Sequence, residues 1–354
     1  MKDYKEELKE LILTTIKEDA SDLHLTVGRH PTIRVTGSLI PLVKKPILSF
    51  EDTEGLIFTM LGEERKQKFI QEKELDFSYS FEDKARFRVN TFFQRGFLGA
   101  SLRLIPTVIK EIEDLNLPGV LKDFASKEQG LFLVVGPIGH GKSTTLASMV
   151  DYINHTRSEH ILTIEDPVEY FFVQDKSIID QREVRIDTKS FHRALRSMFR
   201  EDVNVAMIGE MRDLETISTT ITAAETGHLI FSSLHTNNAA QTIDRIIDSF
   251  PAEQQNQIRL QLSSALLGVF SQRLIPRVSG GLIPAYELLI CTSAIKNLIR
   301  EKRTHEIDIV IETSAELGMV SLNQSLANLV RRGDISVETA LTYSLNPKDL
   351  NGLI

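Results

Sequence analysis

The stretch that most constrains this chain runs from residue 136 to residue 143 and reads Gly-Pro-Ile-Gly-His-Gly-Lys-Ser. It matches the pattern G-x-x-x-x-G-K-S/T, and it lies between an apolar run at 131–135 and a helical pattern that begins at Thr144. In this setting glycines let backbone N–H groups turn inward toward phosphate oxygens, and the helix adds its positive N-terminal end. The sequence therefore predicts a nucleotide-binding P-loop rather than a glycine-rich turn without a ligand.

The loop assigns candidate roles to its own residues. Lys142 is expected to reach the β- and γ-phosphates, and Ser143 is expected to bind Mg²⁺. The expected ligands are therefore ATP and Mg²⁺. The other positions are expected to offer mainly backbone N–H groups. The candidate nucleotide-binding residues of this stretch are Gly136, Pro137, Ile138, Gly139, His140, Gly141, Lys142, Ser143 and Thr144.

Hydrophobic alternation predicts a separate domain ahead of the loop. With 354 residues, the chain exceeds the usual size of a single domain. Short stretches of alternating apolar and polar residues surround one long helical pattern, which indicates an antiparallel α+β domain over residues 1–105. Residues 106–117, which contain Pro106 and three acidic residues, are expected to form a linker. The alternating stretches are 22–27, 33–35, 77–81, 86–90 and 97–103, with a turn at 82–84, and the helical pattern is 53–69.

From residue 118 onward, apolar runs alternate with helical patterns. This order is typical of a mostly parallel sheet with helices on its faces. We therefore expect an α/β nucleotide-binding domain over 118–291, followed by a helical region over 292–354. The apolar runs are 131–135, 161–164, 205–208 and 229–234, and the helical patterns are 143–153, 190–200, 213–225 and 238–249.

The composition argues against several classes of protein. A hydrophobic share of 42% and a charged share of 25% are those of an ordinary globular protein. The net charge of −8 argues against a protein that coats nucleic acid, so no nucleic-acid partner is expected. Cys291 is the only cysteine, which rules out an intrachain disulfide and a cysteine-rich zinc site and fits a reducing compartment.

Two further features bear on the cellular location. The N-terminal residues are charged from the start, unlike a signal peptide. No stretch approaches the run of about 20 apolar residues that a membrane span needs. We therefore expect a cytoplasmic protein that meets the membrane only through partners.

Hydrolysis needs a carboxylate that orients or deprotonates water near the γ-phosphate. The strand at 161–164 is followed by Glu165, Asp166 and Glu169, and the strand at 205–208 is followed by Glu210. In doubly wound sheets, ligands bind at the carboxyl ends of the strands, so these acids are expected near the phosphates. The alternative for each is a helix cap or a solvated loop carboxylate. Because Gly209 stands where a usual Walker B motif has Asp, Mg²⁺ is expected on Ser143 and the phosphates, with Glu169 and Glu210 acting through water.

Two histidines flank the apolar run at 229–234. His228 precedes it and His235 follows it, so they lie at opposite ends of one strand and cannot share a metal ion. His235 is expected to face the γ-phosphate, whereas His228 suits either a structural or an interface role. The alternative for His235 is an ordinary hydrogen-bonded histidine.

Arginines of the first domain form another candidate group. Alternation puts Arg86 and Arg88 on one face of a strand, and Arg103 can lie beside them on the next strand. The ordinary interpretation is a solvated strand face. The functional interpretation is a set of arginine fingers that reach a phosphate bound by a neighbouring domain or subunit.

Taken in order, these motifs resemble the type IV pilus retraction ATPases, the PilT-type twitching-motility motors of the secretion ATPase superfamily. The resemblance covers nearly the whole chain. The matching segments are two N-terminal motifs at 20–25 and 86–90, an Asp box at 161–169, an atypical Walker B motif at 209–213, a His box at 226–236 and an AIRNLIRE-like helix at 294–301.

The resemblance implies a fold, an activity and partners. It implies a PAS-like N-terminal domain and a RecA-like ATPase core, assembled as a homohexameric ring in which the N-terminal domain of one subunit packs on the core of the next. It implies that ATP hydrolysis drives pilus retraction through an inner-membrane platform protein and, indirectly, the pilins. The implied catalytic residues are Glu210, Glu169, Lys142 and His235, and the implied nucleotide-facing residues of the other motifs are Arg86, Arg88, Arg103 and His228.

The chain departs from the family pattern at a few positions. Ile138 and His140 replace the usual Thr and Ser inside the loop, and Lys296 replaces one Arg of the AIRNLIRE motif. The alternatives are a pilus extension or a type II or type IV secretion ATPase, or a regulatory module that binds nucleotide without hydrolysing it. The absence of the four-cysteine zinc site typical of extension and secretion ATPases favours retraction.

Overall fold

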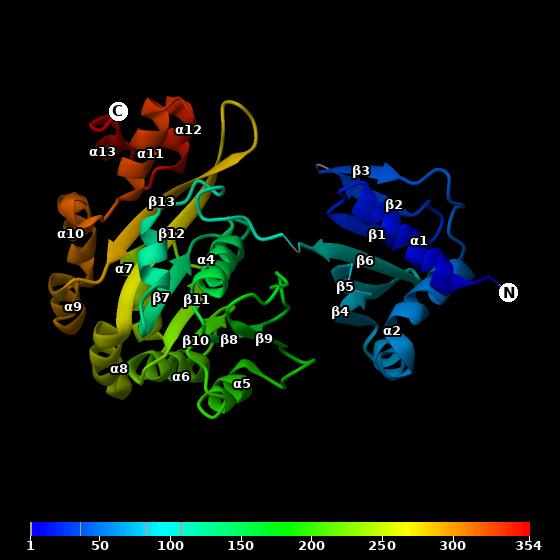
Figure 1. Ribbon diagram of the computed structural model, residues 1–354. Helices are drawn as coiled ribbons and strands as arrows, with labels where there is room; N and C mark the ends of the chain where they lie inside the picture. The colour runs from blue at the N-terminus through cyan, green and yellow to red at the C-terminus, as the bar shows by residue number, and fades with distance from the viewer. Residues whose placement is uncertain (1, 36, 83, 107) are drawn as a thin grey trace. The chain divides into compact units, whose positions relative to one another are not determined.

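The computed structural model describes residues 2–35, 37–82, 84–106 and 108–354, and the chain divides into two compact units. The first unit comprises Met1–Val108 with Pro167–Phe171, and the second comprises Ile109–Asp166 with Phe172–Ile354 (Figure 1). Asp83, in the expected turn, and Thr107, in the expected linker, lie outside the described residues. Each unit has its own sheet and its own hydrophobic core.

The first unit is built on an antiparallel sheet, with the strand order β3-β2-β1-β6-β5-β4 in the described part of the chain. Phe87 and Val89 of β5 are buried, whereas Arg88 between them is exposed, so the alternation in the sequence has the expected structural meaning. The predicted α+β architecture is confirmed. Its elements are α1 (Tyr4–Lys17), β1 (Asp22–Thr26), β2 (Thr32–Val35), β3 (Ser38–Pro41), α2 (Phe50–Glu72), β4 (Glu74–Phe81), β5 (Ala85–Gln94) and β6 (Phe97–Ile105).

Strand β3 was not predicted. All four of its residues are exposed, so no alternation of apolar and polar residues marks it. It pairs with β2 from Val35↔Ser38 to Thr32↔Pro41. Backbone pairing at the sheet edge, rather than burial, therefore makes this segment a strand.

The second unit contains the sheet that carries the P-loop. Its described strands follow the order β13-β12-β7-β11-β10-β8-β9, and all but β13 run parallel to their neighbours. The mostly parallel sheet with interleaved helices is confirmed. The predicted elements are β7 (Gly130–Val135), α4 (Lys142–Thr156), β8 (His160–Glu165), α5 (Phe191–Met198), β10 (Val205–Ile208), α6 (Leu214–Glu225), β11 (Leu229–Leu234) and α7 (Ala239–Asp248).

An antiparallel hairpin closes one edge of this sheet and was missed. Its two strands pair from Gly268↔Ile290 to Pro276↔Leu282, and β12 also pairs in parallel with β7. The turn between them contains Gly280 and Gly281 with φ of +89° and +77°, which is a glycine signal that the sequence does contain. The elements missed in this unit are α3 (Val120–Ala125), β9 (Ile178–Glu183), α8 (Ala252–Ala265), β12 (Leu266–Pro276) and β13 (Leu282–Ile290).

The C-terminal region is helical, as predicted. Figure 1 shows α11, α12 and α13 gathered near the C-terminus, and apolar residues of these helices form one core with Ile275 and Ile283 of the hairpin. The backbone N–H of Tyr286 in β13 also donates to Ser325 Oγ in α11, at 3.1 Å. The elements are α9 (Ser293–Arg300), η1 (Thr304–Glu306), α10 (Ile307–Thr313), η2 (Ala315–Leu317), α11 (Leu322–Arg331), α12 (Val337–Tyr343) and α13 (Pro347–Asn351).

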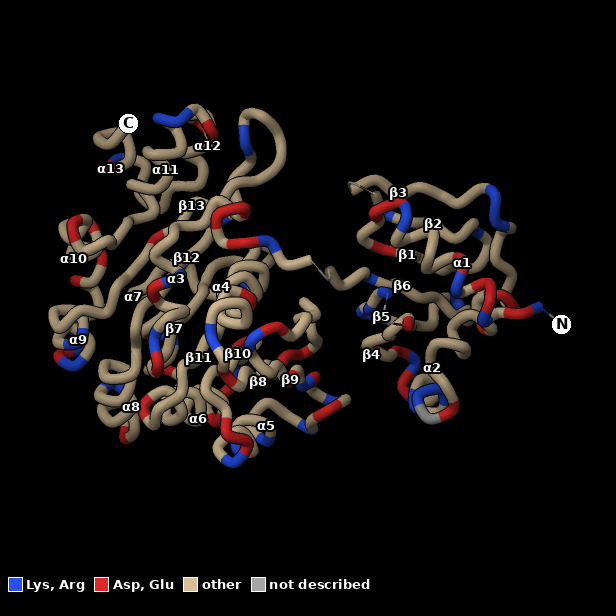
Figure 2. The backbone as a smooth tube through the Cα atoms, in the orientation of Figure 1, with Lys and Arg blue, Asp and Glu red and all other residues tan. Residues whose placement is uncertain are grey.

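Figure 2 shows Lys and Arg interspersed with Asp and Glu along both units. Among residues 2–35, 37–82, 84–106 and 108–354, no helix combines the length and the apolar character that crossing a membrane requires.

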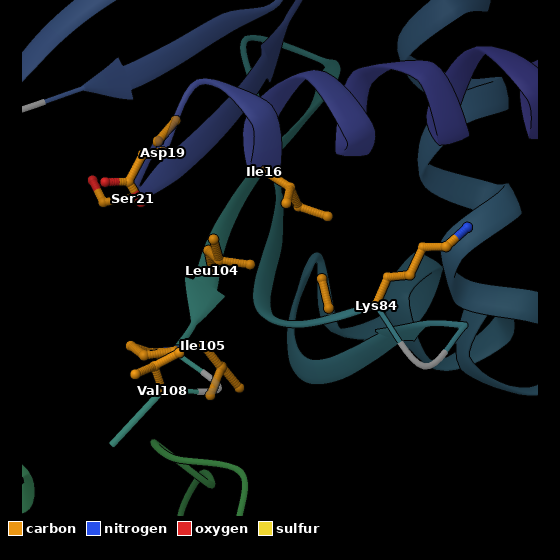
Figure 3. Close-up of a pocket in the computed structure, with 10 residues that line it drawn as sticks. Ile16, Asp19, Ser21, Lys84, Leu104, Ile105 and Val108 are labelled. Carbon is orange, nitrogen blue, oxygen red and sulfur yellow. The ribbon is translucent and has the colours of Figure 1, made fainter. Parts of the chain in front are cut away.

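A hollow of about 370 Å³ lies in the first unit (Figure 3). Ile16 and Leu104 supply apolar surface to its lining, and Asp19 and Lys84 are charged residues of the same lining. None of the predicted nucleotide-binding residues lines it. The hollow is therefore not formed by the residues of the predicted nucleotide site.

Candidate nucleotide-binding site

The P-loop begins directly after β7 and ends in the first turn of α4, as the sequence predicts. Gly136, Gly139 and Gly141 have φ of +143°, +79° and +79°, a backbone region that favours glycine. At Gly136 a side chain is also excluded by close packing, because a Cβ would lie 2.3 Å from the carbonyl oxygen of Gln272. The three glycines therefore permit the tight curl of the loop.

Lys142 folds back over the loop from the first turn of α4. It is only 7% exposed, and its Nζ donates to the carbonyl oxygens of Gly136 and Pro137, both at 2.9 Å. The same Nζ lies 3.1 Å from His235 Nδ1. The ammonium group is therefore positioned where the loop, the helix N-terminus and the end of β11 meet.

His235 links Lys142 to Glu210. Since a lysine ammonium can only donate, Nδ1 of His235 accepts, and its Nε2 then carries the ring proton. Nε2 lies 3.3 Å from Glu210 Oε2, so it donates to that carboxylate. Partial burial, together with the positive charges of Lys142 and Arg212, lowers the pKa of His235, which favours this neutral form.

Glu210 is held from two sides. Its other oxygen, Oε1, is paired with Nε of Arg212, and its side chain is 14% exposed. The segment that carries it is fastened to β11, because Ser233 Oγ donates to the Gly209 carbonyl oxygen at 2.6 Å and Met211 N–H donates to the Ser233 carbonyl oxygen at 3.3 Å. A carboxylate with both oxygens engaged in this way is oriented rather than freely rotating.

Gly209, which replaces the usual Walker B aspartate, lies against β8. Its backbone N–H donates to the Ile164 carbonyl oxygen at 2.8 Å, and a Cβ would lie 3.4 Å from that oxygen and 3.5 Å from Glu165 Cα. These distances are ordinary van der Waals contacts, so packing alone does not require glycine at this position.

The acids after β8 occupy different environments. Glu165 is 5% exposed and accepts from Thr163 Oγ1 at 2.8 Å. Asp166 pairs with Arg185 at 3.3 Å. Glu169 belongs to the segment Pro167–Phe171, which falls in the first unit, so its place near Mg²⁺ stays a prediction.

His228 is not part of this cluster. Seven residue steps separate it from His235, and an extended strand of that length spans roughly 23 Å. Its Nδ1 contacts the Ala223 carbonyl oxygen at 3.1 Å, and its ring meets Phe199 edge-on at 5.5 Å between centroids. The fold therefore brings His235, but not His228, to the P-loop of the same chain.

The arginines of the first unit do form a group. Arg88 of β5 and Arg103 of β6 are directly opposite each other in the sheet, and both are exposed. Arg86 precedes Arg88 by two residues in the same strand, and Arg103 Nε donates to Asp22 Oδ1 at 2.9 Å. Their contact with a nucleotide stays a prediction.

Sequence reasoning missed two side chains that support the P-loop, Gln272 and Thr145, and gave no role to the imidazole of His140. Gln272 of β12 bonds both the loop and α4, and Thr145 is its partner in α4. The imidazole of His140, expected to contribute little, accepts the Leu274 N–H through Nδ1 at 2.9 Å. A glutamine within the mostly apolar strand β12 was an available signal, because a buried polar side chain needs partners.

Comparison with known proteins places this site in a family. The family model described as "Type II/IV secretion system protein" matches residues 3–281. The chain is 46% identical over 343 residues to "Type IV pilus retractation ATPase PilT" of Pseudomonas aeruginosa, covering 97% of this chain and 99% of that protein. It is 42% identical over 322 residues to a "Twitching motility protein" of Neisseria gonorrhoeae, covering 91% of this chain and 86% of that protein.

A solved structure agrees with the sequence comparisons. The structure described as "Crystal Structure of the Pilus Retraction Motor PilT and Bound ADP" is similar with a TM-score of 0.91 and 47% identity, covering 97% of this chain and 98% of that chain. The family model matches most of the chain and these relatives match nearly all of it. The chain therefore belongs to the Type II/IV secretion system protein family.

Proposed function

We propose that this chain is an ATPase motor that hydrolyses ATP to drive retraction of a type IV pilus. The observation that carries the proposal is the full-length likeness to a retraction ATPase and to a pilus retraction motor with bound ADP. The connected cluster of Lys142, His235 and Glu210 supports it, because these side chains meet at the mouth of the P-loop.

The geometry suggests how each residue would act. Lys142, now bonded to the carbonyl oxygens of Gly136 and Pro137, can turn its ammonium to phosphate oxygens of the nucleotide. Glu210, oriented by His235 and Arg212, would act on the attacking water as a general base or orienting group. We propose Glu169 as a further acid of this site.

The residues present also fit Mg²⁺ bound chiefly through the nucleotide. Within the described parts of the chain, no group of three or more His, Cys, Asp or Glu side chains could hold a metal ion by itself. Ser143, in the first turn of α4, would supply a hydroxyl ligand, and the nucleotide phosphates and water would supply the rest. The bound ion would neutralise phosphate charge during hydrolysis.

We further propose the assembly that the resemblance implies. Six copies would form a ring at the inner face of the plasma membrane, where the motor would act on a platform protein and, through it, on pilins. Arg86, Arg88 and Arg103 would then face nucleotide held by a neighbouring core, and His228 would lie at a subunit interface. The domain division of 1–105, 106–117, 118–291 and 292–354 belongs to this proposal.

A deletion strain tests the biological function. If the chain is a retraction motor, cells without it keep or accumulate surface pili and lose twitching motility. The gene for the Lys142→Ala variant should fail to restore twitching, whereas the wild-type gene should restore it. Loss of surface pili in the deletion strain would instead indicate an extension motor and would overturn the proposal.

A further inference from the structure

Strand β12 reaches the P-loop through one buried side chain. Gln272 is only 3% exposed, and its Nε2 donates to the carbonyl oxygen of His140, in the loop, at 2.9 Å. Its Oε1 accepts from Thr145 Oγ1, in α4, at 2.6 Å. One amide group therefore joins the loop to the helix that follows it.

The same strand contacts the loop at two more points. The backbone N–H of Leu274 donates to Nδ1 of His140 at 2.9 Å. The carbonyl oxygen of Gln272 would lie only 2.3 Å from a Cβ on Gly136. Nε2 of the Gln272 side chain would lie 2.9 Å from a Cβ on Gly141. Both ends of the loop are thus packed against residues 272–274 of β12.

The neighbouring residue of β12 contacts the segment after His235. Ser271 Oγ donates to the Asn237 carbonyl oxygen at 2.9 Å. Successive residues of a strand point to opposite faces. Ser271 therefore connects β12 to the segment that follows His235, and Gln272 connects it to the P-loop. Lys142 contacts both the P-loop and His235.

We propose that Gln272 is a positioning residue for nucleotide binding, which acts with Thr145 and His140 to hold the P-loop in its phosphate-binding curl. The inference rests on the proposed function, since it concerns the same nucleotide site. The physical reason is that backbone N–H groups bind phosphate well only when they are already directed at it. The hydrogen bonds of the Gln272 side chain join the P-loop to the first turns of α4, and these two segments supply the backbone N–H groups.

Two isosteric changes test this role in the full-length protein. Gln272→Met keeps the volume and removes both hydrogen bonds, and Thr145→Val removes only the hydroxyl. Each lost bond within a pre-organised loop should weaken ADP binding roughly five- to tenfold. Thr145→Ser, the matched control, retains the hydroxyl and should bind ADP like the wild type.

Calorimetric titration with ADP and with ATP gives the dissociation constants, and the melting temperature without nucleotide gives the structural effect. The proposal expects weaker binding in both variants, rescue in Thr145→Ser, and a double variant whose loss is smaller than the product of the two single losses. If Gln272→Met does not fold, the Thr145→Val and Thr145→Ser pair decides.

Wild-type affinity for ADP in Thr145→Val or in a folded Gln272→Met variant, even with a lowered melting temperature, would assign these residues a purely structural role and overturn the inference. Failure of the proposed function looks different. In that case the wild-type protein itself would bind nucleotide without releasing phosphate, or would not bind it.

Discussion

Glu287 should make the stability of the second unit depend on pH. It lies in β13, is 8% exposed, and its Oε1 accepts the Ala239 N–H at the start of α7, at 2.8 Å. Burial raises its pKa from 4.5 to about 7, and the negative charge of Asp308 adds to the rise, while the Ala239 N–H and Arg273 oppose it. Between these two pH values the folded chain holds a proton that the unfolded chain has released.

The sign and size of the effect follow from this difference. The contribution of Glu287 to the free energy of unfolding is fully present below pH 4.5 and is lost as the pH rises through 7, because ionising the buried carboxyl then opposes folding. The complete loss is about 3 kcal/mol, of which about 2 kcal/mol falls between pH 5.5 and pH 8. Glu287→Gln keeps an oxygen for the Ala239 N–H but cannot ionise. The variant should therefore gain about 2 kcal/mol relative to the wild type when the pH is raised from 5.5 to 8.

Urea unfolding followed by circular dichroism measures this difference, and the chain has no Trp to serve as a fluorescent probe. Glu316→Gln is the matched control, because Glu316 is an exposed glutamate of the same unit. Its unfolding free energy should change with pH like that of the wild type. An unchanged pH dependence in Glu287→Gln would refute the argument from burial.

Three other predictions concern the nucleotide site. Lys142→Ala should weaken ATP binding roughly 10- to 100-fold, because a charge-assisted contact to phosphate is lost, and equilibrium titration checks this. The turnover rate should fall at low pH because of His235. As the pH falls through its lowered pKa, the ring gains a proton on Nδ1 and loses its contact with Lys142. This fall in rate should be absent in His235→Asn, and a pH–rate profile checks it. If arginines act in trans, mixing Arg88→Ala with Glu210→Ala subunits should give activity that depends on the mixing ratio; strictly additive activity would count against it.

The parts of the fold that could be predicted are those whose signals are local. The P-loop at 136–143 is a contiguous motif between a strand and a helix, and the runs at 131–135 and 229–234 are apolar because both faces of the sheet are covered. The carboxyl end of a parallel strand has a fixed relation to its neighbours, so Glu210 and His235 could be assigned to one sheet edge.

The parts that could not be predicted depend on pairing between distant segments. Gln272 reaches the loop only because β12 lies beside β7, more than 130 residues earlier in the chain. The role of the His140 imidazole depends on the same strand, through the Leu274 N–H. Strand β3 carries no burial pattern. The pairing register of two segments that are far apart in the sequence cannot be predicted from either segment alone.

Phosphate release by the purified wild-type chain and by Glu210→Ala, with ATP and Mg²⁺, tests the central claim most directly. The account predicts steady release by the wild type, and ATP binding with release reduced at least 100-fold in the variant, because the oriented carboxylate is lost. Wild-type turnover in Glu210→Ala would contradict the role assigned to this carboxylate. Absence of release by the wild-type chain would contradict the ATPase motor itself.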